Sequence, residues 1–546
     1  MRTLYKFNGG VHPPQHKAES TRQPILAAPL PALLTVPLQQ HIGAPAKALV
    51  RPGDRVLKGQ MIARAEGNVS AAVHAPTSGT VRTVEMRAVP HPSGLRDLCV
   101  EIEVDGEERW IERRPLDAND PGVLRHRLRE SGVVGLGGAV FPSFIKLNPG
   151  NRQKIQTLVI NGAECEPYIT CDDMLMRERA DEIVQGIALM RYMLNAQEVV
   201  VGIEDNKPEA IAAMRAAATQ SDAPIEVVTV PTIYPGGGAK QLVRVLTGIE
   251  VAADARSLDF GVQCFNVATA YAVHRAVHHD EPALSRIVTI TGNVAAPRNY
   301  EALIGTPIAE LLRHAGEKPD TTGHLMGGPM MGFDLPATGV PLTKATNCVI
   351  AKSRALFPPA PAALPCIRCG ECARACPADL QPMDLYWFAK SRNFGKAQEF
   401  ALFDCIECGC CSYVCPSHIP LVQYFRFAKS EIHAREKEKK AADTARERHE
   451  FRLFRIEREK HERAERLAQK ATEKLATLQA EAPSAETNAK QAAILAAIER
   501  AQAKKAGIIP RNIDNLPPEK LAEIAEIEAR RAQMAAMAQT KDSKAE

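Results

Sequence analysis

Two short cysteine runs constrain this chain more than any other feature of its sequence. The first, CIRCGECARACP, occupies residues 366–377, and the second, CIECGCCSYVCP, occupies residues 405–416. Each run has the form C-x2-C-x2-C-x3-C-P, and nine of the 14 cysteines of the chain lie between residues 366 and 415. Repeated thiols at such close, matching spacings are typical of cysteines that hold an inorganic centre.

The spacing is the pattern of bacterial ferredoxins that hold two 4Fe-4S clusters. The first three thiolates of a run surround one face of a cluster, and the fourth faces away and ligates the other cluster. The predicted ligands of cluster 1 are Cys366, Cys369, Cys372 and Cys415, and those of cluster 2 are Cys376, Cys405, Cys408 and Cys411. Cys410 falls outside the pattern and is predicted to be a spare thiol close to cluster 2.

Zinc is the main alternative, because four thiolates also form a closed tetrahedral zinc site. Zinc sites usually use two C-x2-C pairs set well apart, so three cysteines in consecutive steps, twice over, fit zinc poorly. Two clusters joined by exchanged fourth ligands form an electron relay, because neither cluster needs access to a substrate to change its oxidation state. The runs therefore predict electron transfer.

Length and composition set broader limits. A chain of 546 residues predicts several domains, and 45% hydrophobic with 24% charged residues is typical of a soluble globular protein. The low aromatic content and the net charge of +4 give no indication of nucleic-acid binding. The N-terminus lacks the apolar run of a secretory signal, and we expect no membrane-spanning segment. The other five cysteines are therefore predicted to be reduced thiols in a cytosolic compartment.

The first part of the chain predicts an all-β domain over residues 1–110. Short β-branched runs alternate with glycine turns between residues 50 and 84. The phrases GDRVLKGQ and VHAPTSGTV resemble the barrel-sandwich fold of biotinyl and lipoyl carrier domains. Those carriers need a lysine at a hairpin tip, and this sequence has none between Ala65 and Val73. We expect a structural or docking module.

Three further domains and a tail follow. Apolar β runs such as KIQTLVING and AQEVVVGI alternate with helical patterns over residues 125–275, which predicts a Rossmann-like parallel sheet covered by helices. Residues 284–340 resemble the soluble-ligand-binding β-grasp domain that accompanies flavin domains. After the proline-rich stretch LFPPAPAALP, the cysteine runs predict a ferredoxin-like domain over residues 356–427. The expected fold class is therefore multidomain α/β plus β.

Residues 428–546 form an Ala-, Glu- and Lys-rich tail, predicted to be helical or disordered. Its apolar residues, which include Phe451, Phe454 and Leu467, lie mostly three or four apart, so one long helix with a thin apolar seam is expected. The whole net charge of +4 lies in this tail. A solvated helix and a partner-binding helix remain equal alternatives, and attraction to an anionic membrane surface is a weaker one.

A glycine-rich stretch suggests a second cofactor site. SGVVGLGGAVFPSFIKL, residues 131–147, contains Gly135, Gly137 and Gly138, whose backbone amides could approach a phosphate closely. It departs from the G-x-G-x-x-G fingerprint, and an ordinary turn is an equal alternative. The next strand ends near Asn161 and is followed by Glu164 and Glu166, at the edge where open α/β sheets bind ligands.

Together with IYPGGGAKQLV and CFNVATAYAVHRAV, these stretches resemble the flavin-bearing subunit of respiratory complex I. The resemblance implies FMN contacts from Gly135, Gly137, Gly138, Lys146, Asn161 and Glu164. It implies that Phe141 and Glu166 face a nicotinamide nucleotide, and that the pocket is closed by Gly237, Asn266 and Thr269. The chain departs from that subunit at Leu136, Ala163, Gly238 and Ala239, so the flavin and nucleotide contacts differ in detail.

The order of the domains resembles the RnfC (RsxC) family, whose members belong to the Rnf (Rsx) complex, the ion-translocating ferredoxin:NAD oxidoreductase. FNGGVHPP, PTIYPGGGAKQLV, LTGIEV and GGPMMG are similar to that family, and the resemblance covers residues 1–427. It implies a translocase-type oxidoreductase subunit, peripheral on the cytoplasmic face of the bacterial inner membrane, which passes electrons between NAD(H), FMN and two 4Fe-4S clusters. The implied partners are integral-membrane and cluster-bearing subunits, with ferredoxin or another redox protein acting indirectly.

Two other functions remain open. The chain could be the diaphorase subunit of a soluble hydrogenase or formate dehydrogenase, or a non-catalytic scaffold whose clusters only connect or stabilise a complex. The scaffold remains an alternative because residues at the flavin site differ from those of the complex I subunit. No catalytic acid or base is predicted, because a flavin carries out hydride chemistry itself.

Overall fold

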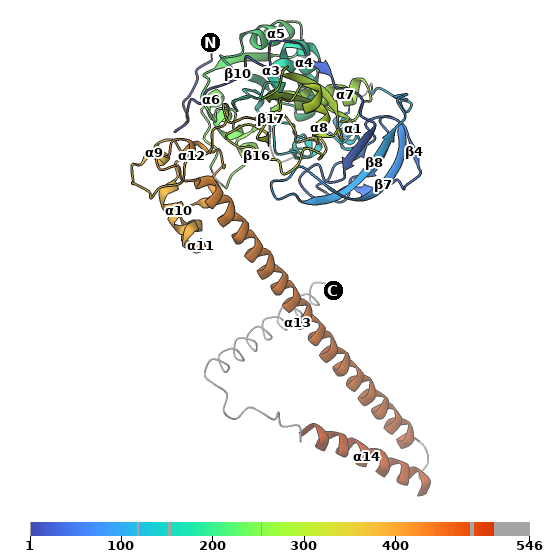
Figure 1. Cartoon of the computed structure of the whole chain (residues 1–546). Coiled ribbons are helices and arrows are strands. Elements are labelled where there is room, and N and C mark those ends of the chain that lie inside the picture. Colours follow the sequence, from blue (N-terminus) through green and yellow to red (C-terminus); the bar gives the residue numbers. More distant parts are fainter. Residues whose placement is uncertain (1, 117–119, 151–153, 253, 481–484, 507–546) are drawn as a thin grey trace. The chain divides into compact units, whose positions relative to one another are not determined.

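The computed structural model describes residues 2–116, 120–150, 154–252, 254–480 and 485–506 (Figure 1). The chain forms two compact units, Met1–Ala434 and Arg435–Glu546. The first unit contains the three sheet-bearing domains and the cysteine runs, whereas the described part of the second unit is helical. Both the multidomain α/β plus β class and the helical tail are therefore confirmed.

The predicted barrel-sandwich domain consists of two small antiparallel sheets, which we call the sandwich domain. One sheet has the order β2 (Leu33–Pro37), β8 (Arg96–Val104), β7 (Gly79–Ala88) and β4 (Arg55–Val56). The other has the order β3 (Lys47–Ala48), β5 (Met61–Arg64) and β6 (Val73–His74). Apart from the longer hairpin strands β7 and β8, the strands have at most five residues, because glycine turns interrupt them as the sequence predicts.

The N-terminal segment does not join this sandwich. It runs along other domains instead: the Tyr5 amide donates to the Val245 carbonyl at 3.0 Å, and Val11 and Tyr234 exchange backbone hydrogen bonds of 2.8 and 3.0 Å. Further on, β1 (Leu26–Ala27) pairs in parallel with β14 of the β-grasp sheet. Residues 2–30 therefore connect domains that lie far apart in the sequence.

The α/β domain contains a fully parallel sheet with the order β11-β10-β9-β12. Its strands are β9 (Thr157–Gly162), β10 (Glu198–Glu204), β11 (Ile225–Val230) and β12 (Val262–Asn266). Its helices are α1 (Pro121–Glu130), α2 (Ser143–Lys146), α3 (Cys171–Glu178), α4 (Ala180–Leu194), α5 (Pro208–Thr219), α6 (Ala239–Thr247) and α7 (Val267–His278), with a 3₁₀ turn η1 (Ser257–Phe260). The order reverses direction between β9 and β12, which creates the switch point of an open α/β sheet.

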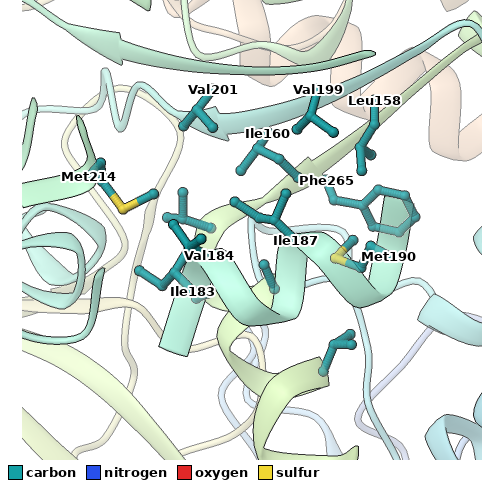
Figure 2. Packing of buried hydrophobic residues seen from close by; sticks show 14 of the residues in the cluster. Leu158, Ile160, Ile183, Val184, Ile187, Met190, Val199, Val201, Met214 and Phe265 are labelled. Carbon is teal, nitrogen blue, oxygen red and sulfur yellow. The ribbon is translucent and has the colours of Figure 1, made fainter. Parts of the chain in front are cut away.

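Alternate residues of these strands enter two different cores. Leu158 and Ile160 pack into the larger core with α4, whereas Val159 packs with Leu242 and Leu246 of α6 on the other face. Figure 2 shows Ile183, Val184, Ile187 and Met190 of α4 beneath Leu158, Ile160, Val199 and Val201. Because both faces are buried, the strands read as continuous apolar runs instead of alternating ones.

Helices α4 and α7 approach so closely that one position between them admits only glycine. A Cβ added to Gly186 of α4 would lie 1.9 Å from the Ala270 carbonyl oxygen of α7. We expect Gly186→Ala to lower the free energy of unfolding by about 3 kcal/mol or more, because a backbone atom must move. Chemical denaturation measures this loss. Gly395→Ala is the control, because its Cβ would meet no atom within 4 Å, and an equal loss there would contradict the prediction.

The β-grasp domain forms a mixed sheet with the order β1-β14-β13-β17-β15-β16. Its elements are β13 (Ser285–Gly292), β14 (Arg298–Leu303), α8 (Ile308–His314), β15 (Gly323–Met326), β16 (Phe333–Asp334) and β17 (Cys348–Lys352). Strand β17 lies beyond the predicted segment 284–340 yet is central in the sheet. This domain shares one hydrophobic core with the sandwich domain, to which Val36, Ile102, Val288 and Ile290 belong.

The cysteine-rich domain, residues 356–427, is built from short helices, and Figure 1 shows them gathered beside the start of α13. They are α9 (Glu371–Arg374), α10 (Pro382–Lys390), α11 (Phe394–Glu399), η2 (Leu402–Asp404) and α12 (Cys410–Tyr413). Helix α13 (Leu421–Ala480) begins inside the predicted ferredoxin-like segment, and Phe425 and Ala428 are buried in its core. The first turns of the long helix thus complete this domain.

The tail continues as α13 and α14 (Ala485–Ala506), and residues 507–546 of the predicted tail lie outside the described residues. Phe451, Phe454 and Leu467 of the predicted seam are exposed. None of the helices in the described ranges is long and apolar enough to cross a membrane.

Candidate redox site

Two cavities in the cysteine-rich domain are each lined by four cysteines. One is lined by Cys366, Cys369, Cys372 and Cys415, and the other by Cys376, Cys405, Cys408 and Cys411. Each cavity therefore takes three cysteines from one run and the last cysteine from the other run. The structure brings together the two sets that the ferredoxin pattern predicts, including the exchanged fourth members.

The local fold explains why three cysteines of each run converge. Gly370 and Gly409 adopt positive φ angles of 80° and 85°, and each precedes a four-residue helix, α9 or α12. A left-handed residue at this place turns the chain so that the cysteines on both sides face one cavity. Since the two runs repeat this geometry, the domain contains two similar loops.

The cavities suit thiolate-held clusters. Their other lining residues are mostly apolar, such as Leu385 and Phe425 in the second cavity. Backbone amides also point at sulfurs of the cavity cysteines: the Leu380 amide donates to Cys376 Sγ and the Glu407 amide to Cys405 Sγ, both at 3.4 Å. Amide hydrogen bonds to sulfur and low solvent exposure are the features with which proteins tune such clusters.

The two cavities differ in their surroundings. Cys408 and Cys411 are buried, and Cys408 belongs to a hydrophobic cluster with Tyr234 of the α/β domain. Cys369 of the other cavity is exposed, and its neighbour Ile367 is 68% exposed. The second cavity therefore faces the α/β domain, whereas the first opens towards the protein surface.

The switch point of the parallel sheet gathers several of the residues predicted to bind flavin. Asn161 and Asn266 are paired at the carboxyl ends of the adjacent strands β9 and β12. The Asn161 amide donates to the Gly237 carbonyl at 2.8 Å, and a Cβ at Gly137 would lie 3.0 Å from Asn266 Cβ. Thr269 joins them, because its hydroxyl accepts the Leu136 amide proton at 3.0 Å.

The glycine loop itself leaves room at its tip. Gly138 has a φ of 126°, and a Cβ built there would meet no atom within 4 Å. Gly135 donates its amide to the Phe141 carbonyl at 2.8 Å, which closes the loop on itself. Lys146 lies against β12, where its ammonium donates to the Cys264 carbonyl and sits 4.3 Å from the Phe265 ring centroid. Burial lowers the pKa of Lys146.

Glu164 closes the loop after β9 onto helix α3. Its carboxylate accepts the amide protons of Asp172 at 2.7 Å and of Asp173 at 3.2 Å, at the helix N-terminus. Burial, and then the charge of Glu164, raise the pKa of Asp172 to about 7. Asp172 in turn accepts a hydrogen bond from Asn266 at 2.5 Å. Asp172 thus links Glu164 to Asn266, because its amide donates to Glu164 and its carboxylate accepts from Asn266.

Glu166 is placed differently from the residues at the switch point. Its carboxylate accepts the amide protons of Met330 at 2.7 Å and Met331 at 3.1 Å, in the GGPMMG loop of the β-grasp domain. A Cβ at Gly328 would lie 2.1 Å from Glu166 Cγ, so only glycine fits there. Burial raises the pKa of Glu166. Its predicted contact with a nicotinamide nucleotide stays a prediction.

Two further residues that the structure places at these sites, Lys17 and Tyr234, could not be recognised from the sequence. Lys17 is buried, and its ammonium donates to the carbonyls of Glu164, Glu166 and Ile169 at 2.8, 2.9 and 2.5 Å. Tyr234 lies within IYPGGGAKQLV, a stretch that resembles a family motif but indicates no role for the tyrosine. A lone lysine near the N-terminus carries no local signal of burial.

Four models of known protein families match successive parts of the chain. Residues 5–107 match the RnfC barrel sandwich hybrid domain, and residues 128–275 match the Nuo51 FMN-binding domain. Residues 287–334 match the SLBB domain, and residues 365–419 match the 4Fe-4S dicluster domain.

Curated relatives cover nearly the whole chain. The RnfC subunit of the ion-translocating oxidoreductase complex of Haemophilus influenzae (strain 86-028NP) is 45% identical over 526 residues, which is 95% of this chain and 77% of the relative. The chain belongs to the RnfC family. The RnfC subunit of Yersinia pseudotuberculosis (serotype O:3, strain YPIII) is likewise 45% identical, over 97% of this chain and 75% of the relative.

Membership of the RnfC family, together with the domains present, establishes the general function. The chain is an electron-transfer subunit of an oxidoreductase complex, with an FMN-binding domain and a 4Fe-4S dicluster domain, and it has partner subunits in that complex. An NAD⁺-reducing [NiFe]-hydrogenase in its air-oxidized state is a distant match, with 18% identity and a TM-score of 0.42 over 56% of this chain and 63% of the other. A TM-score this low does not establish a common fold.

Proposed function

We propose that this subunit passes electrons between NAD(H) and the other subunits of a membrane-bound ferredoxin:NAD oxidoreductase, by way of FMN and two 4Fe-4S clusters. The observation that carries the proposal is the pair of four-cysteine cavities, one of which adjoins the α/β domain that matches an FMN-binding family. FMN, when bound, exchanges a two-electron hydride for single electrons that clusters can accept. Residues of one compact unit, Met1–Ala434, would hold all of these centres.

The surroundings of the cavities support an order for the centres. The Cys376, Cys405, Cys408 and Cys411 cavity adjoins the α/β domain, so cluster 2 would exchange electrons with the flavin. The Cys366, Cys369, Cys372 and Cys415 cavity lies near exposed apolar residues, Ile367 among them, so cluster 1 would face a partner. An exposed apolar patch is typical of a surface that contacts another protein.

The switch point is the proposed FMN site. Gly135, Gly137 and Gly138 offer a glycine loop beside the ends of β9 and β12, and Asn161 and Asn266 supply side-chain amides there. Lys146, Glu164, Gly237 and Thr269 hold these elements together through the hydrogen bonds described above. Phe141 and Glu166 remain the proposed neighbours of the nucleotide.

The proposed location is the cytoplasmic face of the bacterial inner membrane, where the chain would bind as a peripheral protein. The proposed partners are integral-membrane and cluster-bearing subunits of the complex, with ferredoxin or another redox protein reached through them. Membership of the family of ion-translocating complexes favours this over a diaphorase of a soluble hydrogenase. Co-purification with membrane subunits after detergent extraction tests the location.

A second candidate is a scaffold that carries electrons between clusters but accepts no hydride. The Glu166 carboxylate already accepts hydrogen bonds from two backbone amides. Ala163 is fully buried at a position where the flavin-bearing subunit of complex I has an acidic residue. These observations favour a nucleotide site that differs from that of complex I. The scaffold predicts intact clusters without NADH-dependent reduction of flavin.

One anaerobic preparation of the full chain, reconstituted with iron, sulfide and FMN, separates the two candidates. We expect NADH to bleach the flavin absorbance and then to produce the electron paramagnetic resonance (EPR) signals of reduced clusters. Dithionite is the control, because it reduces the clusters directly and needs no hydride transfer to the flavin. Clusters that respond to dithionite while NADH leaves the flavin oxidised would support the scaffold, and a colourless or zinc-containing protein would contradict both candidates.

A further inference from the structure

Four segments from different domains meet beside the Cys408 loop. They are the N-terminal segment at Val11, the loop after β11 at Tyr234, the β-grasp loop at Met330, and the cysteine-rich domain itself. A separate hydrophobic cluster includes Val11, Tyr234, Ala375, Cys408 and Cys410, with Cys165 and Met330 packed against it. We call this cluster the junction. It lies between the α/β domain and the cavity proposed for cluster 2.

Tyr234 is the centre of the junction. Its side chain is only 1% exposed, and its hydroxyl donates to the carbonyl of Cys408 at 2.6 Å. Its backbone carbonyl accepts the Val11 amide proton at 2.8 Å and lies 3.9 Å from Cys410 Sγ. One residue of the α/β domain therefore contacts two cysteines of the second run.

Glu166, which follows the end of β9, contacts the junction from the α/β domain. Its carboxylate neighbours the Tyr234 hydroxyl and accepts the amide protons of Met330 and Met331. The Met330 carbonyl oxygen would lie 2.7 Å from a Cβ at Gly409, the residue after Cys408, so the β-grasp loop presses directly on the cluster loop. The contacts thus run from Glu166 through two backbone segments to one cysteine loop.

We propose that Tyr234 and Glu166 are positioning residues that hold the Cys408 loop against the α/β domain and set the reduction potential of cluster 2. The inference rests on the proposed function, because it requires clusters in the two cavities. Hydrogen bonds and solvent exclusion around ligand cysteines are the principal means by which proteins tune cluster potentials. The Tyr234 hydroxyl supplies a hydrogen bond to the Cys408 peptide, and Glu166 holds the Met330 loop against Gly409, next to that peptide.

Cluster 1 provides an internal reference. Of its proposed ligands, Cys366, Cys369, Cys372 and Cys415, none belongs to the junction as described. A change confined to the junction should therefore move the potential of cluster 2 alone. A change that disturbs the fold of the whole domain would move both.

The test is an EPR redox titration of the reconstituted full chain carrying Tyr234→Phe. We expect the ratio of reduced to oxidised cluster 2 at a fixed potential to fall about fivefold, the factor that corresponds to one hydrogen bond of about 1 kcal/mol. In the wild-type protein, the dipole of the Tyr234 hydroxyl favours the reduced cluster, which is the more negative state. Loss of this hydroxyl in Tyr234→Phe therefore lowers the reduction potential of cluster 2. The signal of cluster 2 is assigned as the one that Cys376→Ser abolishes.

Tyr413→Phe is the matched control, because Tyr413 lies on α12 in the same domain and is 50% exposed. We expect it to leave both potentials unchanged. Unchanged potentials in Tyr234→Phe, with wild-type iron and flavin contents, would overturn the inference and leave the proposed function intact. Wild-type protein without clusters would instead overturn the proposed function.

A second pair of variants keeps the inference testable if Tyr234→Phe fails to fold. Glu166→Ala leaves two loop amides unpaired, whereas Glu166→Gln retains an acceptor oxygen for them. We expect Glu166→Ala to shift the potential of cluster 2 and Glu166→Gln to shift it less, with cluster 1 unchanged in both. A raised KM for NADH with wild-type potentials in both variants would assign Glu166 to nucleotide binding and overturn its positioning role.

Discussion

Replacing Cys376 by serine is expected to remove the cluster of the second cysteine run and to leave the cluster of its own run. Cys376 belongs to the first run but lines the cavity formed by Cys405, Cys408 and Cys411. We expect the iron and acid-labile sulfide contents to fall by about half, because each of the two 4Fe-4S clusters holds half of the iron and sulfide. Metal analysis and EPR spectroscopy of the anaerobic protein measure both quantities.

The reciprocal change and a neighbouring thiol provide the controls. Cys415→Ser should remove the cluster held by Cys366, Cys369 and Cys372, so the two variants lose different EPR signals. Cys410→Ser should retain both clusters, because Cys410 lines neither cavity. Loss of the same cluster in Cys376→Ser and in Cys366→Ser would show that the fourth ligands are not exchanged.

Replacing Lys17 by methionine is expected to destabilise the loop that carries Glu164 and Glu166. The ammonium has three protons, and three backbone carbonyls accept them in a buried site. Methionine fills much of the same space but leaves the three carbonyls unpaired, at a cost of about 1 to 3 kcal/mol each before relaxation. We expect the free energy of unfolding to fall by about 3 to 5 kcal/mol, measured by denaturant titration, together with weaker retention of FMN.

Lys6→Met is the matched control for this variant. Lys6 lies in the same N-terminal segment and is exposed, so its replacement should change stability by less than about 0.5 kcal/mol. Normal FMN retention and normal stability in Lys17→Met would show that the loop is held by other contacts.

The two sets of four cysteines that line the cavities could be predicted from local spacing alone. A cluster is larger than a single side chain, so its first three ligands come from one short loop, and the turn glycines Gly370 and Gly409 lie within the runs themselves. The exchange of the fourth cysteines follows from the number of residues between the third and fourth cysteines of each run. No tertiary contact had to be known.

The strand ends at the proposed flavin site were predictable for a similar reason. Asn161 ends an apolar run, and in a parallel sheet the carboxyl ends of neighbouring strands lie at one edge. The surroundings of Glu166 were not predictable, because its partners Met330 and Met331 lie 164 and 165 residues further along the chain. The burial of Lys17 was equally hidden, since its three acceptors are backbone atoms about 150 residues away.

The amino-acid sequence by itself determined the succession of domains, the two sets of cysteines that line the cavities, and the edge of the sheet where a flavin would bind. Each of these depends on residues that are close in the chain, where spacing and periodicity dictate geometry. Only the tertiary structure decided that the N-terminal segment, the β-grasp loop and Tyr234 meet beside Cys408. Backbone carbonyls and amides make many of those contacts, and every residue type carries them, so the side-chain pattern holds no record of their pairing.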